Sequence, residues 1–224
     1  MNLARVVYVI GILLFSFHSL EASETGYKEF SSCDDPNYAG YINARLAFYD
    51  KLAIEDYEET KNPSFETLSY FKKYTYLHKN TINSARFDNK DIAMTHIESY
   101  MQKNFGLFGN SDGYHRTNIA RGWLALAAKN EQKAIDFLMA STSIPFPTSA
   151  VLASFGPDMT LLRELYRRGH TQAALDYLEA VQTFWNTEIA LKKIKIWKKM
   201  IAVDCPAQFQ FYDTTNFKKL NLSL

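Results

Sequence analysis

Histidine is the side chain in this sequence with the widest capacity for metal or acid–base chemistry. Four histidines follow the N-terminal segment: His78, His96, His115 and His170. A helical zinc site needs two histidines one turn apart, and other zinc sites need closely paired cysteines. Neither spacing occurs, and the segment around His96 lacks a second histidine. We therefore predict no metal ion, and we expect these histidines in the core or on the surface.

Glycines between residues 106 and 113 resemble the start of a phosphate or calcium site. Gly106, Gly109 and Gly113 are not followed by the Lys-Ser or Lys-Thr pair of a phosphate loop. The segment 110–113 begins like a calcium loop, but the later acidic positions are absent. The segment is more typical of a loop between helices, and we predict that its glycines interrupt the helical pattern.

Clustered carboxylates are the remaining candidates for acid–base chemistry. Four acids stand close together: Glu55, Asp56, Glu58 and Glu59. Consecutive acids at a helix end are usually solvated, so we assign no reaction to them. The lack of a strand pattern disfavours an α/β-hydrolase. The sequence thus predicts no catalytic residue and no cofactor, although an enzymatic role stays open.

The first 22 residues have the pattern of a secretory signal peptide. Arg5 precedes an apolar run over 6–17, and small and polar residues follow at 19–23. Twelve apolar residues are few for a membrane span, which needs about 20. We expect export to the periplasm or the medium with cleavage near residue 22. An uncleaved N-terminal anchor is the alternative.

The chain has two cysteines, Cys33 and Cys205, and neither lies in a nucleophile motif. An even number of cysteines in an exported protein favours a disulfide. We predict that the two pair. Two unrelated free thiols are the alternative.

The distribution of charge argues against a nucleic-acid partner and allows two interpretations of the predicted helix at 187–203. The 25 basic and 24 acidic residues leave a net charge of +1, which is not the electrostatic pattern of a nucleic-acid-binding protein. Basic residues gather in a predicted helix at 187–203, at Lys192, Lys193, Lys195, Lys198 and Lys199. This helix either contacts an anionic membrane or partner or caps the end of a helical array.

Helical periodicity runs through most of the chain. Apolar residues at intervals of three or four predict a long helix over 37–60, and Asn62-Pro63 starts the next. After a polar stretch at 80–89, a third amphipathic segment has Ile92, Ala93, Ile97, Tyr100 and Met101 on its inward face. These patterns predict an all-α protein.

A repeated hairpin follows. Residues 115–128 and 131–141 predict two helices joined at Lys129-Asn130, and a helix opened by Pro157 pairs with 171–184 across Arg168-Gly169-His170. Residues 134–140 and 174–180 share Ala, Asp, Leu and Ala at an offset of 40 residues. Such a period is typical of a helical solenoid.

This repeat resembles a divergent tetratricopeptide repeat (TPR). Gly122, Ala134 and Leu138 have the spacing of the TPR signature, but Leu162 replaces the glycine in the later copy. The period exceeds the usual ~34 residues, with the excess at 142–156. Residues 115–185 also resemble a group of uncharacterised bacterial TPR-like proteins, through His115, Asn118, Gly122, Ser154, Phe155, Gly156, Pro157, Phe184 and Trp185. This resemblance implies a fold and no reaction.

We therefore predict a signal peptide (1–22), an N-terminal extension (23–36), a TPR-like helical domain or α-solenoid (37–203) and a C-terminal tail (204–224). The function expected is that of an exported scaffold or adaptor that binds a protein or peptide in a helical groove. A cell-envelope enzyme, or an accessory subunit of one, is the alternative.

The TPR resemblance places Arg116, Ile119 and Trp123 on the groove of the helix that begins near His115. Trp and Arg are favoured binding anchors. Core packing is the competing role for Trp123. His115 and Asn118, at the start of the helix, are further candidates, and their competing role is to cap the helix or to hold the glycine-rich loop.

Overall fold

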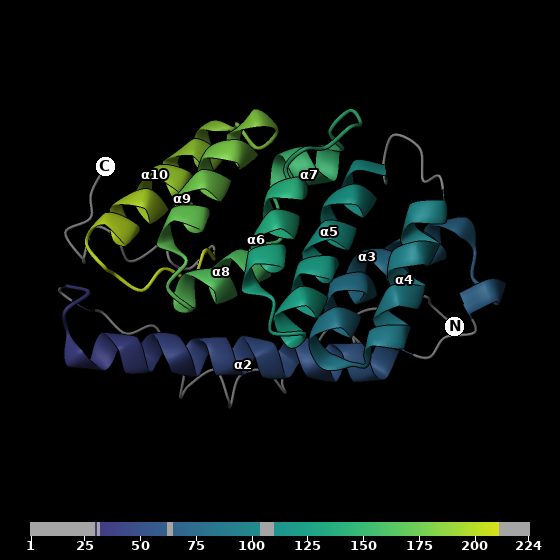
Figure 1. The fold of residues 1–224 in the computed structure, drawn as a ribbon, viewed down its shortest axis with the longest axis horizontal. Helices are drawn as coiled ribbons and strands as arrows, with labels where there is room; N and C mark the ends of the chain where they lie inside the picture. The colour runs from purple at the N-terminus through teal and green to yellow at the C-terminus, as the bar shows by residue number, and fades with distance from the viewer. Residues whose placement is uncertain (1–29, 31, 62–64, 104–109, 211–224) are drawn as a thin grey trace, which may run out of the picture.

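The computed structural model describes residues 30, 32–61, 65–103 and 110–210. All regular secondary structure in these ranges is helical, which confirms the predicted all-α class (Figure 1). The predicted signal peptide and residues 211–224 of the predicted tail lie outside the described residues. Within the described ranges, no helix combines the length and apolar character needed to cross a membrane.

The α-helices follow one another with short connections. They are α2 (Pro36–Thr60), α3 (Tyr70–Phe87), α4 (Lys90–Gln102), α5 (Asn110–Ala127), α6 (Glu131–Ala140), α7 (Ala150–Phe155), α8 (Thr160–Arg167), α9 (Thr171–Ala180) and α10 (Glu188–Ala202). Single 3-10 turns lie at η2 (Phe65–Thr67) and η4 (Val181–Thr183).

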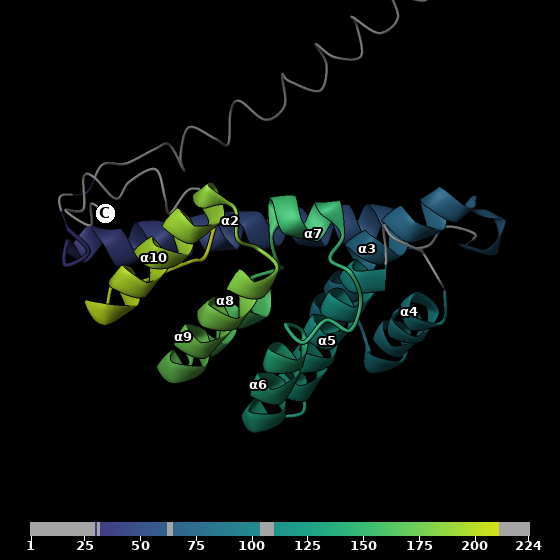
Figure 2. The ribbon, with the colours of Figure 1, turned by 90° about the horizontal axis from the view of Figure 1, so that it is seen from above.

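Three hairpins, α3/α4, α5/α6 and α8/α9, lie side by side, and α2 runs along one edge of them (Figures 1 and 2). Contacts of α3 with α5 and of α6 with α8 join each hairpin to the next. The first helix of every hairpin lies nearer to α2 than the second does (Figure 2). The hairpins therefore share one core beside a single long helix.

Local sequence explains where the helices begin and turn. Asp35 accepts a hydrogen bond from the N–H of Asn37 at the start of α2, and Pro36 occupies the first turn. Asn130 caps α6 in the same way, after Lys129 has turned the chain with a φ of 59°. Both predicted hairpin turns, Lys129-Asn130 and Arg168-Gly169-His170, are present.

The α5/α6 hairpin packs closely on α8 because Gly122 has no side chain. A Cβ at Gly122 would overlap Leu161 of α8 and lie 3.4 Å from the carbonyl oxygen of Ala134. Ala134 and its repeat partner Ala174 are 0% and 1% exposed. The alanines at the repeat offset therefore both face packed interfaces.

Four sequence expectations about elements need correction. The polar stretch 80–89 does not lie outside the helices, because α3 continues to Phe87 and buries Asn80, Thr81 and Ser84. Helix α5 begins at Asn110 and includes Gly113, so this glycine does not interrupt the helix. Ile92 and Met101 are 37% and 44% exposed rather than inward. Pro157 precedes α8 by three residues, and the excess residues of the repeat contain α7.

The two ends of the described chain are joined. Cys33 and Cys205 form a disulfide with Cα atoms 5.3 Å apart, as predicted. The side chain of Gln208 donates to the carbonyl oxygen of Ile42 over 3.1 Å. Cys205, Ala207 and Phe209 are buried, so the first residues of the predicted tail belong to the core.

Candidate functional site

Two cavities adjoin the turn at 155–158, between α7 and α8. The first has a volume of about 200 Å³ and is lined by His78, Asp112, His115, Arg116, Val151, Leu152, Phe155, Gly156 and Asp158. The second has a volume of about 250 Å³ and is lined by Arg116, Phe155, Gly156, Pro157, Asp158, Met159, Thr160, Trp185, Lys193, Trp197, Phe209 and Gln210. Arg116 and the turn contribute to both cavities, so they stand at the boundary between them.

His115, on α5, holds the turn in place. Its Nδ1–H donates to the carbonyl oxygen of Ser141 over 3.1 Å, and its Nε2 accepts the backbone N–H of Asp158 over 3.0 Å. The side chain is buried, and burial lowers its pKa to about 4. His115 is therefore a neutral histidine with both nitrogens in use, and its position in the first cavity is structural.

Arg116, the next residue on α5, differs from His115 because its side chain forms no hydrogen bond to the described residues. Its side chain is only 21% exposed, and the nearest carboxylate oxygen, Oδ2 of Asp158, lies 4.0 Å from Nη1. That separation permits attraction but is too long for a hydrogen bond. No hydrogen bond from the guanidinium is found within the described part of the chain. Its five N–H donors therefore border two cavities without an acceptor from these residues.

Asp112 and Asp158 flank Arg116 in different environments. Burial raises the pKa of Asp112, and this outweighs the hydrogen bond from Ser149 and the charge of Arg116. For Asp158, burial also favours the neutral form, but Arg116 and the hydrogen bonds from Thr160 lower its pKa overall. The Oδ1 of Asp158 accepts both the N–H and the hydroxyl of Thr160. Asp112 thus binds a proton more readily than Asp158 does.

Aromatic side chains from α3 and α4 contact two residues that line the first cavity. The hydroxyl of Tyr100 lies 3.4 Å from Nδ1 of His78, and the hydroxyl of Tyr74 donates to Asp112 over 3.4 Å. Burial lowers the pKa of His78 to about 3, so this imidazole is neutral near neutral pH. The charge of the first cavity therefore lies on Arg116 and the two aspartates.

Aromatic rings form one wall of the second cavity. Trp185 and Trp197 stack with ring centroids 6.1 Å apart, and Phe209 meets Trp197 edge to face at 5.7 Å. The amine of Lys193 lies 5.8 Å from the centroid of Trp185, and burial lowers its pKa to about 8. The rim includes Phe155, which is 73% exposed.

Glycine is required at position 156, in the turn that adjoins both cavities. Its φ is +84°, and a Cβ there would lie 2.5 Å from Cε2 of Trp185. Gly156 therefore brings the turn against the indole ring. The ring of His115 also lies 6.4 Å from that of Phe184. Residues quoted above for the bacterial resemblance thus meet around this turn.

The other residues predicted to bind lie away from the cavities. Ile119 is fully buried in the core, and Asn118 is 4% exposed, with its amide donating to the carbonyl oxygen of Tyr114. Trp123 donates from Nε1 to the hydroxyl of Thr160 over 3.3 Å and packs against the guanidinium of Arg86. Of the five predicted residues, only His115 and Arg116 line the two cavities.

Sequence reasoning missed three features of the site. Asp112 was considered only within the calcium-loop segment 110–113, and Asp158 was not singled out, because lone aspartates next to glycine or proline are common in turns. Residues 109–113 also have Gly-x-Ser-x-Gly spacing, the pattern of a serine nucleophile. The Oγ of Ser111 accepts the N–H of Ser149 over 2.9 Å, and Ser111 is 1% exposed. Its described partner is thus an amide rather than a base.

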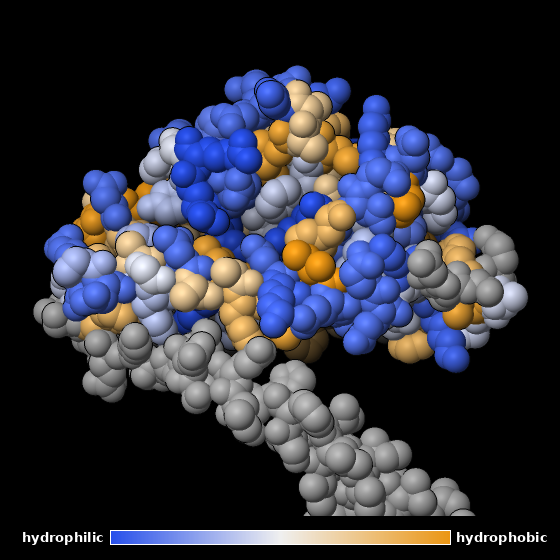
Figure 3. Space-filling view, turned by 90° about the horizontal axis from the view of Figure 1, so that it is seen from below, coloured by the Kyte–Doolittle hydropathy of each residue, from blue (hydrophilic) through white to orange (hydrophobic). Residues whose placement is uncertain are grey.

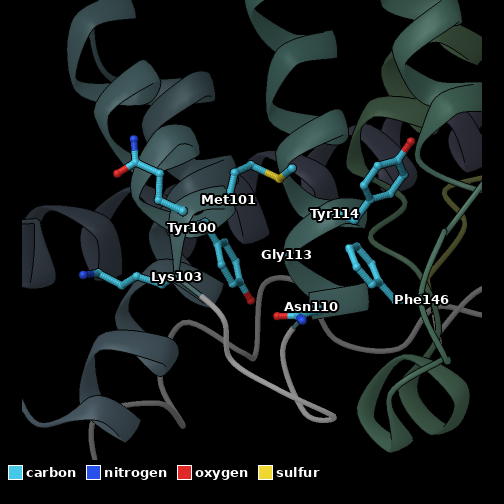
Figure 4. A pocket seen from close by; sticks show the side chains of 8 residues that line it. Tyr100, Met101, Lys103, Asn110, Gly113, Tyr114 and Phe146 are labelled. Atoms are coloured by element: carbon cyan, nitrogen blue, oxygen red, sulfur yellow. The ribbon is translucent and has the colours of Figure 1, made fainter.

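A third cavity, of about 130 Å³, lies between α4 and α5 (Figure 4). Tyr114 of α5 and Phe146 of the loop between α6 and α7 meet there with ring centroids 6.4 Å apart. The amine of Lys103 points away from the other labelled side chains in this view. No carboxylate or histidine is among the described residues that line this cavity. No group of three or more metal-binding side chains occurs within the described ranges.

Comparison with known proteins adds no relative. No protein-family model matches the chain, and no curated protein or solved structure matches it. The two cavities and Arg116 are therefore the features that indicate a function.

Proposed function

We propose that the protein is an exported TPR-like helical array that binds an anionic group of a protein or peptide through Arg116. One observation carries the proposal: a mostly buried guanidinium borders two cavities without a hydrogen bond in the described chain. A guanidinium presents a planar fork of donors that matches carboxylate and phosphate groups. An acceptor from outside the chain would satisfy these donors.

The surrounding structure supports recognition by an enclosed site. Hydrophilic side chains dominate the face seen from below, where hydrophobic residues form separate patches (Figure 3). A broad apolar surface is the usual sign of a large hydrophobic interface. The two cavities at Arg116 instead suit a small anchoring group of a partner.

Export is supported by the disulfide between Cys33 and Cys205, because such bonds persist mainly in oxidising compartments. Intact-mass analysis of protein from the exported fraction tests this part of the proposal. We expect a chain that lacks about 22 N-terminal residues and gains the mass of two hydrogens on reduction. A full-length cytosolic chain with two alkylatable thiols would contradict it.

Crosslinked capture from an envelope extract tests the role of Arg116. Arg116→Gln removes the charge and the fork, and we expect it to lose most of the captured partner. Arg121→Gln, on the same helix, is the matched control and should retain it. Both variants must first melt like the wild type. Equal capture by the folded Arg116→Gln variant would refute the proposal.

The observation that favours the alternative, a cell-envelope enzyme, is the pair Asp112 and Asp158. They line one cavity, and their pKa values shift in opposite directions, as the acid and the base of a reaction require. A panel of chromogenic ester, amide, phosphate and glycoside substrates tests this alternative. Turnover lost in Asp112→Asn and kept in the exposed Asp136→Asn would support an enzyme.

A further inference from the structure

We propose that the anionic group is a carboxylate on a single apolar, preferably aromatic, body. Arg116 would hold the carboxylate, and the second cavity would hold the body. The inference rests on the proposed function, because it assumes that Arg116 binds an anion. It goes beyond that function by naming the chemical class of the ligand.

One wall of the second cavity matches an apolar body. Trp185, Trp197 and Phe209 form one stacked and edge-to-face cluster, and Phe155 stands at the rim with 73% of its surface exposed. When a ligand covers a large exposed aromatic ring, apolar surface is removed from water, and this favours binding. The indole N–H of Trp197, a lining residue, is buried and has no hydrogen-bond partner among the described residues.

The charges of the described lining favour a monoanion. Arg116 and Lys193 are its two cations, and Asp158 is its carboxylate. Asp112 adds another acid on the far side of Arg116, in the first cavity. With Lys193 protonated, the charges of Arg116, Lys193 and Asp158 sum to +1, which a carboxylate neutralises and a phosphate dianion exceeds. The planar carboxylate also fits the guanidinium fork with two parallel hydrogen bonds.

The volume limits the size of the body. A cavity of about 250 Å³ lies below the usual range for drug-sized ligands, about 300–1,000 Å³. It suits one ring or one branched side chain. Two sources provide this chemistry: the last residue of a peptide with a free C-terminus, and a free small carboxylic acid.

Isothermal titration of the full mature chain with paired probes tests the inference. N-acetylphenylalanine and N-acetylphenylalanine amide differ only in the charge of the end group. We expect the acid to bind about tenfold or more tightly than the amide, because only the acid forms charge-assisted hydrogen bonds with Arg116. A pentapeptide ending in phenylalanine, with a free or an amidated C-terminus, then separates the two sources. Tighter binding of the free-ended peptide than of the single residue favours a chain terminus.

Variants locate the binding. Arg116→Gln should abolish the preference for the acid, and Lys193→Gln should weaken binding of the acid more than that of the amide. Lys195→Gln, exposed on the same helix, should change neither. Phe155→Ala alters an exposed side chain, so it should fold normally and weaken both probes. This variant keeps the test valid if Lys193→Gln does not fold.

Three outcomes would overturn the inference. They are equal binding of acid and amide, tighter binding of phenyl phosphate than of the acid, and no saturation by the acid up to about 10 mM. If any of these occurs while Arg116→Gln still loses the captured partner, the ligand class is wrong and the proposed function stands. If Arg116→Gln also keeps the partner, both fail.

Discussion

Both ring nitrogens of His115 are occupied, and this decides its role. A proton on Nε2 would point at the N–H of Asp158, so the charged imidazole cannot keep that hydrogen bond. Burial acts in the same direction and lowers the pKa of His115 to about 4. Protonation of His115 at acidic pH therefore destabilises the turn beside Arg116.

We predict that the protein loses stability between pH 6.5 and pH 4. In this window the unfolded chain protonates His115 and His78, while the folded chain, with pKa values of about 4 and about 3, does not. The unfolded state binds more protons. The free energy of unfolding therefore decreases as the pH is lowered, by about 1.4 kcal/mol per pH unit for each histidine. Asp112, whose pKa is raised, acts in the opposite direction.

Denaturant titrations at several pH values measure this slope. In His115→Gln, the glutamine can accept a hydrogen bond from Asp158 and donate one to Ser141, but it does not titrate. The free energy of unfolding of this variant should therefore change less with pH, by about 1.4 kcal/mol per pH unit. Asp112→Asn should make the slope steeper by removing the opposing group. A pH slope unchanged in His115→Gln would contradict the assignment.

Gly156 offers a second test at the residue scale. Gly156→Ala forces an alanine to a φ of +84° and places its Cβ 2.5 Å from Trp185. Gly169 is the matched control, with a φ of +92° and nothing within 4 Å of a Cβ. We expect about 1–2 kcal/mol of destabilisation from Gly169→Ala and about 1–3 kcal/mol more from Gly156→Ala. Equal thermal shifts would show that the turn can move away from Trp185.

At this scale the sequence identified residues better than roles. His115, Gly122 and Gly156 were all singled out, and all three take part in close packing. Asp112 and Asp158 were missed, because only the packing of α3, α5 and the turn before α8 brings them to one cavity. The sequence around either aspartate does not indicate that the two lie close together in the fold.

At the scale of elements, the offset of 40 residues between α6 and α9 can be tested by mutation. Ala134 and Ala174 are buried at equivalent places in α6 and α9. Ala134→Leu and Ala174→Leu should each overpack their interface and cost about 1–3 kcal/mol. Ala127→Leu, exposed at the end of α5, should leave the melting temperature nearly unchanged. Wild-type melting of both buried variants would show that the repeat register is wrong.

Helix positions were predictable where apolar residues recur every three or four positions, and less so where polar residues enter the core. Asn80, Thr81 and Ser84 hid the second half of α3. Thr81 and Ser84 bond to carbonyl oxygens one turn back, at Leu77 and Thr81. These bonds satisfy their hydroxyls inside the helix, so the polar run continues α3 instead of ending it.

At the scale of the whole molecule, α2 joins hairpins that are distant in sequence. Asp50 of α2 pairs with Arg86 of α3 and lies 3.8 Å from Arg163 of α8. The hydroxyl of Tyr57 donates to Asp88 over 2.9 Å, where α3 ends. Periodicity predicted this helix but not its place, because one amphipathic face does not specify which hairpins it covers.

The disulfide fixes the same helix near its start, and its removal is the last prediction. It closes a loop of 172 residues, and in the chain-entropy model such a crosslink stabilises the fold by about 5 kcal/mol. Reduction should therefore lower the free energy of unfolding of the wild type by up to that amount. The double variant Cys33→Ala/Cys205→Ala should be less stable and insensitive to reductant.

Urea titrations with and without a phosphine reductant, with thiol alkylation followed by mass, measure the effect. The sulfur of Cys205 is buried, so the reductant must act on partly unfolded chains, and incubation in mild denaturant allows this. Because α2 also pairs with Arg86 and Arg163, we expect the reduced protein to fold with its helices intact. A fully alkylated chain as stable as the oxidised one would show that the other contacts of α2 hold it without the disulfide, and that the long loop costs little to close.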